Sequence, residues 1–502
     1  MDKRPMRIFF LLRHSEYLRN YESVVRLLAA RGHTVHLGFY KIGEDYKESE
    51  IRKLQQDNGN ITYALYSWRD RLWTPIATPI RLLQTYLRFL DTRYHGSNKL
   101  RQRAASELPS LLCFLLKIVV GNSEKRIWSF VRFLRKIERA IPVDLAVRKI
   151  LKSNNPDVFL VTPLIDLKAS QLTWLKGAKF LSIKTGLCVF SWDNLTNKSL
   201  IQLETDIVLV WNEIQKREAI EFHRIAPSKV AITGAQCYDK WFDHKPSTSR
   251  EDFLRNVGLG SQSPYILYLC SSPFIAPKEV EFVERWTRNL RKHKDPDLNN
   301  LGVLIRPHPR NFQQWEDVDL SHLQDVVIYP RKGANPVNEN AVNEFYDSIY
   351  HSVAAVGINT SAMIEAGILN KPVFTILAPD FNTTQEGTLH FHYLVRGGLL
   401  YISDSLDEHL DQLSKVLNGQ SSYQEKIRSF IESFVRPHGL DSPSTPIFVE
   451  AVENLDKMSF TSPEYKKPWW SYPFIVFLFP FAVIRYLIMQ TTRAIRKVGR
   501  QD

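Results

Sequence analysis

The sequence predicts an α/β protein of two domains, each built around a parallel sheet. Its 502 residues exceed what a single hydrophobic core usually organises, so two domains of about 200 residues each are expected. Short apolar runs alternate with helical spacing of apolar residues along both halves of the chain, which is typical of strand–helix–strand units with parallel strands. The content of 44% hydrophobic and 24% charged residues is that of a globular protein.

The first strand–helix–strand unit lies near the N-terminus. Residues 7–12 form a continuous apolar run, as expected for a strand buried on both faces. A polar loop containing His14 follows, then a helical pattern that ends at Gly32, then a second strand at 34–39. The first turn lacks Gly-x-Gly-x-x-Gly spacing, so this unit is not a dinucleotide fingerprint. Further strands of the first domain are expected at 157–161, 179–183, 207–211 and 230–233.

Residues 73–140 interrupt this rhythm. They show a helical pattern rich in Arg, Leu and Phe, with a nearly uncharged stretch at 108–120 and a basic stretch at 125–139. The segment is either a helical insertion that packs on the first domain or a second amphipathic surface that faces a membrane.

The composition of the chain indicates where the first domain ends and the second begins. Residues 243–263 are polar and contain Ser and Pro, which indicates a linker between the domains. Strands of the second domain are expected at 265–270, 302–305, 326–329, 353–356 and 373–377. The predicted organisation is a first domain at 1–242, the linker, a second α/β domain at 264–435, a crossover helix at 436–461 and a membrane-associating tail at 462–502.

Charge and cysteine content restrict the partners and the compartment. The formal net charge of +13 suits an anionic partner, but no basic-aromatic module of a nucleic-acid-binding type is present. The N-terminus lacks a signal-peptide pattern. The cysteines are scattered and fall into no metal or disulfide spacing, so we expect reduced thiols in a cytoplasmic protein; they are Cys113, Cys188, Cys237 and Cys270.

The C-terminal tail has the layering of a membrane interface. Aromatic residues come first, an apolar block at 474–484 follows, and a basic end closes the chain. Pro480 and Arg485 interrupt the block, which is therefore shorter than the roughly 20 residues of a spanning helix. We predict an in-plane or re-entrant anchor on an anionic membrane; a tilted span over 474–489 and a buried helix are the alternatives. The basic residues are Arg485, Arg493, Arg496, Lys497 and Arg500.

Two motifs predict phosphate and ribose binding in the second domain. In the first, Arg306, His308 and Arg310 alternate with two prolines after an apolar strand, which predicts a rigid phosphate-binding cluster; a tight turn with solvated arginines is the alternative. In the second, Gly357 begins a turn that brings Thr360 and Ser361 to a helix N-terminus, where N–H groups and the helix dipole attract anions.

Glu365 lies four residues after Ser361, about one turn along the same helix face. Its carboxylate could accept hydrogen bonds from both hydroxyls of a ribose. A plain N-cap at Thr360 or Ser361 explains those two residues as well, but it does not explain the acidic residue behind them.

These motifs, with Thr233-Gly234-Ala235, resemble those of GT-B-fold glycosyltransferases over residues 6–455. The lipid-linked N-acetylglucosaminyltransferase of peptidoglycan synthesis is a familiar member, and the His-Pro and Ser segments are similar to bacterial polysialyl-, Kdo- and CDP-glycerol-type transferases. The resemblance implies two Rossmann-like domains facing a central cleft. It also implies that Arg306, His308, Thr360 and Ser361 hold the donor phosphates and Glu365 the ribose.

The resemblance extends to the donor sugar and to catalysis. The loop after 373–377 corresponds to one that binds donor-sugar hydroxyls, and the matching residue types here are Gln385, Glu386 and His390, although the usual order of these residues is not reproduced. His14 occupies the region where some inverting enzymes place a general base, a role that an imidazole neutral near pH 7 can fill; a surface histidine is the alternative.

Asp193 is a second catalytic candidate. It follows Trp192 in a segment that could offer an aromatic face beside a carboxylate to a sugar. A buried Trp with an Asx turn is the equal alternative.

The predicted function is metal-independent and needs no cofactor, because Arg, His and a helix N-terminus meet the phosphate charge and no His/Cys ligand set is present. A sugar would pass from a nucleotide-activated donor to a membrane-linked or surface glycan at the cytoplasmic face of the plasma membrane. The alternatives are a CDP-glycerol-type polyol-phosphate transferase, a non-hydrolysing nucleotide-sugar 2-epimerase of the same fold, and an inactive scaffold. The donor's sugar and base, and the acceptor, stay open.

Overall fold

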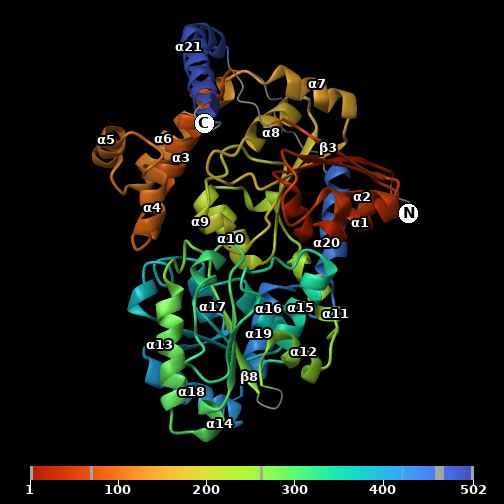
Figure 1. The fold of residues 1–502 in the computed structure, drawn as a ribbon. Helices are drawn as coiled ribbons and strands as arrows, with labels where there is room; N and C mark the ends of the chain where they lie inside the picture. Colours follow the sequence, from red (N-terminus) through yellow and green to blue (C-terminus); the bar gives the residue numbers. More distant parts are fainter. Residues whose placement is uncertain (1–3, 68–71, 261–263, 421, 458–468, 499–502) are drawn as a thin grey trace. The chain divides into compact units, whose positions relative to one another are not determined.

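The computed structural model describes residues 4–67, 72–260, 264–420, 422–457 and 469–498. The chain divides into two compact units (Figure 1). Unit 1 comprises the chain up to Thr233 and from Thr445 onward, and unit 2 is Gly234–Ser444. Each unit contains one parallel β-sheet with helices.

Unit 1 has seven parallel strands in the order β3-β2-β1-β4-β5-β6-β7. The apolar run Arg7–Leu12 is strand β1, which pairs with β2 on one side and β4 on the other. The strand order therefore reverses between β1 and β4, and such a switch point is where open α/β sheets bind ligands. The other strands are β2 Thr34–Phe39, β3 Ile61–Leu65, β4 Val158–Thr162, β5 Lys184–Cys188, β6 Ile207–Val210 and β7 Val230–Ile232.

One predicted strand of unit 1 is wrong. Residues 179–183 were expected to be extended, but helix α8 (Gln171–Phe180) continues into this stretch and β5 begins at Lys184. A turn with Ser182 at a φ of 58° separates the two elements. The apolar residues of the last helical turn imitate a short strand in the sequence. The helices flanking this sheet include α1 Glu22–Ala30, α2 Glu48–Asp57, α7 Leu145–Asn154, α9 Asn194–Asn197 and α10 Glu213–His223.

The insertion at 73–140 forms four helices, of which α3 and α6 pack against each other. Helix α5 of the insertion has exposed apolar side chains; Leu111 and Phe114 are 68% and 61% exposed. The segment therefore combines a packed part with an apolar helix whose outer side chains are exposed. The bounds are α3 Thr74–Arg88, α4 Asn98–Ala105, α5 Ser110–Val120 and α6 Glu124–Ala140.

Unit 2 has six parallel strands in the order β10-β9-β8-β11-β12-β13, with the order reversing between β8 and β11. Residues 243–260, the described part of the predicted linker at 243–263, belong to this unit. They contain helix α12 (Arg250–Val257), which Ser249 caps by accepting from the Asp252 N–H. The strands are β8 Tyr265–Leu269, β9 Gly302–Arg306, β10 Val326–Ile328, β11 Ala354–Gly357, β12 Val373–Ile376 and β13 Leu400–Ser403.

The polar character of 243–249 comes from anchoring rather than from a free linker. The hydroxyls of Ser247 and Thr248 donate to the buried carboxylate of Asp347 at 2.7 and 2.8 Å. Asp347 lies on helix α15 (Glu339–Tyr350). The other long helices of unit 2 are α13 Glu279–Lys292, α18 Leu406–Leu417 and α19 Gln424–Phe434.

Helix α20 (Ser444–Lys457) returns the chain to unit 1. Its Glu453 is buried, 3.0 Å from both the Arg31 guanidinium and the His33 imidazole. The Met6 N–H donates to His33 Nδ1 at 3.1 Å. Nε2 of a neutral ring therefore carries the hydrogen that Glu453 accepts. These contacts fix α20 against the N-terminal strand and helix of the first sheet.

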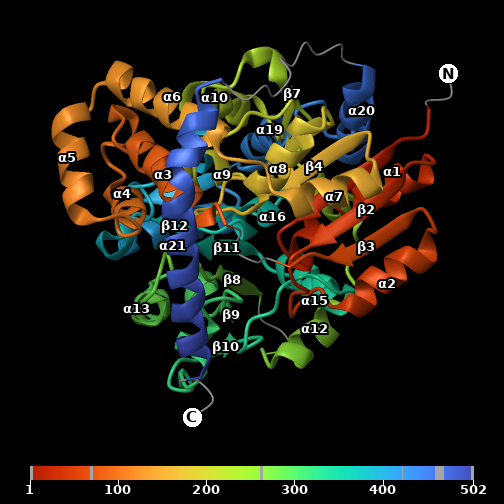
Figure 2. The same ribbon diagram turned by 90° about the horizontal axis from the view of Figure 1, so that it is seen from above.

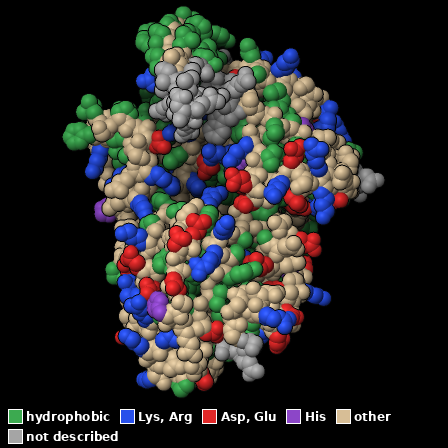
Figure 3. Space-filling view, in the orientation of Figure 1, with side chains coloured by type: hydrophobic (Ala, Val, Ile, Leu, Met, Phe, Trp, Pro, Cys, Tyr) green, Lys and Arg blue, Asp and Glu red, His purple; other side chains and the backbone are tan. Residues whose placement is uncertain are grey.

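The tail forms one long helix, α21 (Ser471–Val498), which contacts α3 and α6 (Figure 2). It continues through Pro480 and Arg485, which the sequence had indicated as interruptions. Ser471–Met489 is therefore apolar and long enough to cross a membrane by length and composition. Hydrophobic side chains gather over this helix in Figure 3. Residues 462–468 and Arg500 lie outside the described residues, as do the side chains of Arg493, Arg496 and Lys497.

Candidate functional site

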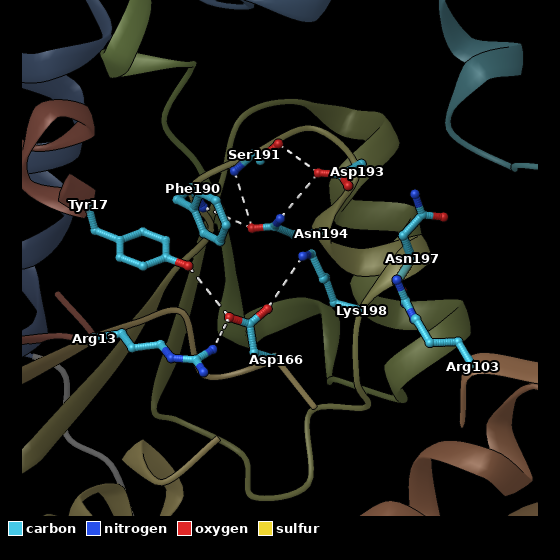
Figure 4. Close-up of polar contacts among 10 residues, drawn as sticks. All are labelled: Arg13, Tyr17, Arg103, Asp166, Phe190, Ser191, Asp193, Asn194, Asn197 and Lys198. Atoms are coloured by element: carbon cyan, nitrogen blue, oxygen red, sulfur yellow. Dashed lines mark hydrogen bonds and ion pairs between the residues drawn. The ribbon is translucent and has the colours of Figure 1, made fainter. Parts of the chain in front are cut away.

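In unit 1, polar side chains meet where β1, β4 and β5 end (Figure 4). The carboxylate of Asp166, after β4, is at the centre. It accepts from Arg13 at 2.8 Å and lies 3.5 Å from the Lys198 ammonium. The Tyr17 hydroxyl approaches the same carboxylate at 3.5 Å. Charged and hydroxyl groups at a sheet switch point can bind a polar ligand such as a sugar.

His14 lies at the same edge. Its Nδ1 is 3.1 Å from Glu16 Oε2, and the side chain is only 14% exposed. The ring packs on Tyr17 with centroids 4.5 Å apart, and Tyr17 in turn meets the Phe190 ring edge to face at 4.8 Å. This mostly buried placement differs from that of a surface histidine.

Asp193 takes part in a tight turn after β5. The Asn194 side-chain oxygen accepts from the N–H groups of Phe190 and Ser191 at 3.3 and 3.2 Å. The Ser191 hydroxyl donates to Asp193 Oδ1 at 2.7 Å. Trp192 is 4% exposed. The structure thus contains the buried Trp and the side-chain-closed turn, and not an open aromatic face for a sugar.

The insertion holds this loop in place. Arg88 of α3 is buried and donates to the carbonyl oxygens of Leu195, Thr196 and Ser199 at 3.1, 2.6 and 3.2 Å. His223 accepts from the Ile201 N–H at its Nδ1. Burial, with a further contribution from the Arg88 charge, lowers the pKa of His223 well below its ordinary value. A neutral His223 and a charged Arg88 therefore fix the segment that carries Asp193 and Lys198.

In unit 2, both sequence motifs meet at Ser271, which follows β8. On one side the Asn311 side chain donates to the Ser271 carbonyl at 2.9 Å, and on the other the Asn359 N–H donates to the Ser271 hydroxyl at 3.3 Å. Strands β9 and β11 flank β8 in the sheet. The loop with His308 and the loop with Thr360 are therefore held beside each other at the switch point.

The predicted basic cluster is divided. Arg306 is buried, forms an ion pair with Glu344 of α15 at 2.6 Å and lies over the Phe345 ring. His308 is half-buried, and its Nδ1 accepts from the Arg310 N–H at 3.0 Å. A neutral His308 ring then carries its hydrogen on Nε2, the form that donates to a phosphate oxygen. The Arg310 side chain is exposed.

The second motif places its residues around a close backbone approach. A Cβ on Gly357 would lie 2.8 Å from the Leu269 carbonyl oxygen, so only glycine fits there. Thr360 is 9% exposed, whereas Ser361 is exposed and immediately precedes helix α16 (Ala362–Ile368). Glu365 is half-buried on that helix. The Ser361 side chain makes no capping hydrogen bond, so an N-cap bond does not explain this serine.

Gln385 has a supporting position. It is fully buried, and its amide donates to the carbonyl oxygens of Ile358 and Ile376 at 3.1 and 2.9 Å. It therefore braces the loop that leads to Thr360. Glu386 is exposed and accepts from Asn382 at 2.8 Å, and His390 is buried. The role of these three residues in sugar binding stays a prediction.

Sequence reasoning missed residues of both sites. Asp166, Arg13 and Lys198 come together only through the sheet order, and no local motif marks them. Glu279, the first residue of α13, accepts a hydrogen bond from the Ser271 N–H. It was also missed, because no local motif marks it. Within the described ranges, no group of three or more His, Cys, Asp or Glu residues could hold a metal ion. Metal independence and the absence of a cofactor stay predictions.

Buried Glu279 should make the free energy of unfolding depend on pH. It is fully buried and accepts from the Ser271 N–H at 2.8 Å. Burial raises its pKa from 4.5 to about 8. Because the folded-state pKa is the higher one, this group stabilises the fold at low pH, and the contribution is lost as pH rises from 4.5 to about 8. Relative to Glu279→Gln, the wild type should lose roughly 1 kcal/mol per pH unit in that window. Denaturant unfolding of both proteins across it measures the difference; parallel pH profiles would contradict the assignment.

The fold is shared with solved UDP-GlcNAc 2-epimerases and with a solved glycosyltransferase. No family model matches the chain, and no curated protein matches it. The UDP-GlcNAc 2-epimerase from Neisseria meningitidis bound to UDP-GlcNAc is 13% identical, with 89% of this chain and 99% of that chain covered and a TM-score of 0.51. A glycosyltransferase from Rickettsia africae ESF-5 is 11% identical, with 91% and 100% covered and a TM-score of 0.51. The chain has a GT-B-like fold.

A putative UDP-N-acetylglucosamine 2-epimerase from Listeria monocytogenes gives the same result, with 11% identity, 92% and 99% coverage and a TM-score of 0.51. The GT-B-like likeness covers both units. It agrees with the fold class predicted from the sequence, two α/β domains with parallel sheets. At this level of identity, the chemistry of the GT-B-like chain has to be argued from its own residues.

Proposed function

We propose that this GT-B-like protein is a glycosyltransferase that moves a sugar from a nucleotide-activated donor to a membrane-linked or surface glycan. The observation that carries the proposal is the junction at Ser271, which holds the His308 loop and the Thr360 loop together at the switch point of unit 2. In this position His308 Nε2 and the Thr360 and Ser361 hydroxyls donate to the donor phosphates. Arg306, already paired with Glu344, positions the loop and adds positive charge behind it.

In the proposed reaction, His14 of unit 1 removes the proton from an acceptor hydroxyl. The acceptor oxygen then bonds to the anomeric carbon of the donor sugar, and the bond from that carbon to the phosphate oxygen breaks. The negative charge passes to the departing nucleotide phosphate, where hydrogen-bond donors stabilise it. Direct displacement of this kind inverts the anomeric configuration. Asp166, Arg13 and Lys198 supply hydrogen bonds to the acceptor.

A donor screen tests the proposal. A nucleotide sugar that binds the native state raises its melting temperature by mass action. We expect one among UDP-, GDP-, CDP- and CMP-linked sugars to do so and to release its nucleotide when an acceptor glycan is added. CDP-glycerol belongs in the screen, because stabilisation by that compound alone would indicate a polyol-phosphate transferase. If none of these compounds shifts the melting temperature, the proposal fails.

A 2-epimerase is the second candidate, supported by the shared fold with the Neisseria enzyme crystallised with UDP-GlcNAc. The two reactions differ in their products. A transferase needs an acceptor and releases the nucleotide, whereas an epimerase converts the nucleotide sugar alone into its C2 epimer. Analysis of UDP-GlcNAc after incubation without acceptor therefore separates them, and formation of the C2 epimer would favour the epimerase.

Glu365 is expected to recognise the ribose of the donor. If its carboxylate accepts from both ribose hydroxyls, Glu365→Ala should bind the ribonucleotide about tenfold or more weakly, the scale of a hydrogen bond to a charged group. The 2′-deoxy analogue should lose less, so the variant discriminates less between the two. Calorimetric titration of wild type and variant with both nucleotides measures this. Equal losses for the two nucleotides would assign Glu365 to helix packing instead.

We also propose that the enzyme works at the cytoplasmic face of the plasma membrane, held there by α21. The exposed apolar side chains of this helix support the proposal: Val476 and Phe477 are 73% and 67% exposed. Helix α5 presents a second apolar surface in the same unit, with Ile118 63% exposed. The net charge of +13 adds attraction to anionic lipids.

A further inference from the structure

Unit 1 contains a cavity of about 660 Å³ whose walls are largely apolar. It lies between the start of α3, the segment before α7 and one side of α8. Trp73, Val143 and Phe180 contribute apolar surface. Neither the residues drawn in Figure 4 nor those of the donor loops line it. The cavity is therefore separate from the sites described above.

Cationic side chains line one part of the cavity. Arg81 of α3 and Lys176 of α8 are 8% and 2% exposed, and both approach the carboxylate of Glu138, at 2.8 and 3.4 Å. Burial alone would raise the pKa of Glu138, but the two cations outweigh it and hold that pKa below its usual value. One ionised carboxylate thus faces two buried cations. Arg148 and Asp144 also line the cavity, so three cations face two carboxylates there, and the remaining positive charge favours an additional anion.

The hydrogen-bonding capacity of this part is incomplete. Arg81 Nε is buried, and so is Nε of Arg148, which lies over the Phe180 ring; neither atom has a hydrogen-bond partner in the described part of the chain. Arg81 is more than nine-tenths buried and lines the cavity. Asp144, another lining residue, accepts from the Val147 N–H as the cap of α7. Arg81 and Arg148 line the cavity with unused hydrogen-bonding capacity, which favours an anionic oxygen beside them.

The cavity borders the helix suited to a bilayer. Tyr472, in the first turn of α21, is one of its lining residues. Trp73 lies at the cavity as well and faces the Phe479 ring of α21 at 6.4 Å. A molecule in the cavity therefore lies next to the apolar stretch Ser471–Met489. An anionic group among the cations and a hydrocarbon chain along the apolar wall would both be accommodated.

We propose that this cavity binds the phosphate-bearing head group of a membrane lipid. The part of the lipid's hydrocarbon chain nearest the head group would lie against the apolar wall and α21. The inference goes beyond the proposed transfer reaction and stands without it, because it depends on no donor-binding residue. A phospholipid and free inorganic phosphate both offer a phosphate anion. The apolar walls favour the lipid, because only the lipid has a hydrocarbon chain to bury against them. A lipid bound beside α21 would help to attach unit 1 to the membrane.

Titration of the full-length protein in an uncharged maltoside detergent with dihexanoyl phosphatidic acid tests the proposal. We expect saturable binding to the wild type. Arg148→Ala removes a lining cation, and Ala146→Trp fills the cavity from a lining position; each should weaken binding about tenfold or more. Lys149→Ala is the matched control, because Lys149 is the neighbouring exposed cation and does not line the cavity. Its affinity should stay within about twofold of wild type.

Two comparisons distinguish the ligand sources. Dihexanoyl phosphatidylcholine, which lacks the net negative charge, and inorganic phosphate, which lacks the chain, should both bind much more weakly than the phosphatidic acid. Thermal melting of the variants shows that each is folded; Arg81 is left intact because its removal would strand Glu138. Equal affinity of all four proteins for phosphatidic acid would overturn the proposal. So would inorganic phosphate binding as tightly as the lipid.

Discussion

Replacing His14 with alanine is expected to lower kcat by about 10²–10⁴, the usual contribution of a general base, and to leave donor affinity nearly unchanged. The reason is that His14 lies in unit 1 beside Glu16 and Tyr17, whereas the predicted donor residues all lie in unit 2. Steady-state rates of nucleotide release with a saturating acceptor measure the loss, and donor titration measures the affinity.

Two controls sharpen the test of His14. Glu16→Gln keeps the size of the side chain but removes the negative charge near Nδ1, so kcat should fall less, by about tenfold, and the pH–rate profile should shift. His36→Gln replaces another histidine of the same sheet, one that lies within hydrogen-bond distance of Thr62 and Tyr66. Its kcat should stay near that of wild type. Equal activity of His14→Ala and wild type would remove His14 from the reaction.

Removing residues 466–502 is expected to release most of the protein from membranes. The apolar stretch of α21 contributes an insertion free energy of about 25 cal/mol per Å² of buried apolar surface, and each basic residue near an anionic bilayer adds about 1 kcal/mol. Salt screens only the second contribution, so high salt should detach the full-length protein only in part. Activity on a short soluble acceptor should persist, while activity on a lipid-linked acceptor should fall.

Flotation with vesicles of phosphatidylcholine and phosphatidylglycerol measures membrane release for the full-length and truncated proteins. A double variant that keeps the chain length, Val476→Ser with Phe477→Ser, is the control for deletion, because both side chains are exposed on α21. It should bind vesicles at an intermediate level. If the full-length protein does not float with anionic vesicles at low salt, α21 serves as a packing element on α3 and α6.

Most central strands were predictable from the sequence, as were the edge strands β7 and β10, but the edge strands β3 and β13 were missed. The runs that became β1 and β9 are continuously apolar because both faces of a central strand are buried. Strands β3 and β13 lie at the edges of their sheets, and their partly exposed side chains do not form such a run. The same limit applies to residues 243–263, where polar residues that cap and anchor α12 imitate a linker.

In the candidate sites, motifs within one loop were predictable from the sequence, whereas contacts between residues far apart in the chain were not. The prolines around His308 and the Gly357 turn are local, so their loops could be recognised directly. The partners that decide what each side chain does come from elsewhere in the chain: Glu344 engages Arg306, and backbone carbonyls engage Gln385. Asp166 meets Arg13 only because β4 pairs with β1. Spacing along the chain contains no signal for such contacts.

If the loops joined at Ser271 hold the phosphates of a nucleotide sugar, His308→Ala should bind that donor more weakly. Titration of this variant with the donor found in the screen tests the proposed function most directly. We expect a loss of about 1.5–3 kcal/mol in binding free energy, the scale of a charge-assisted hydrogen bond, with an unchanged melting temperature of the free protein. His322→Ala is the matched control, because His322 is an exposed histidine of the same unit that pairs with Glu284 away from Ser271. Its affinity should equal that of wild type. A donor affinity of His308→Ala equal to that of His322→Ala would contradict the account.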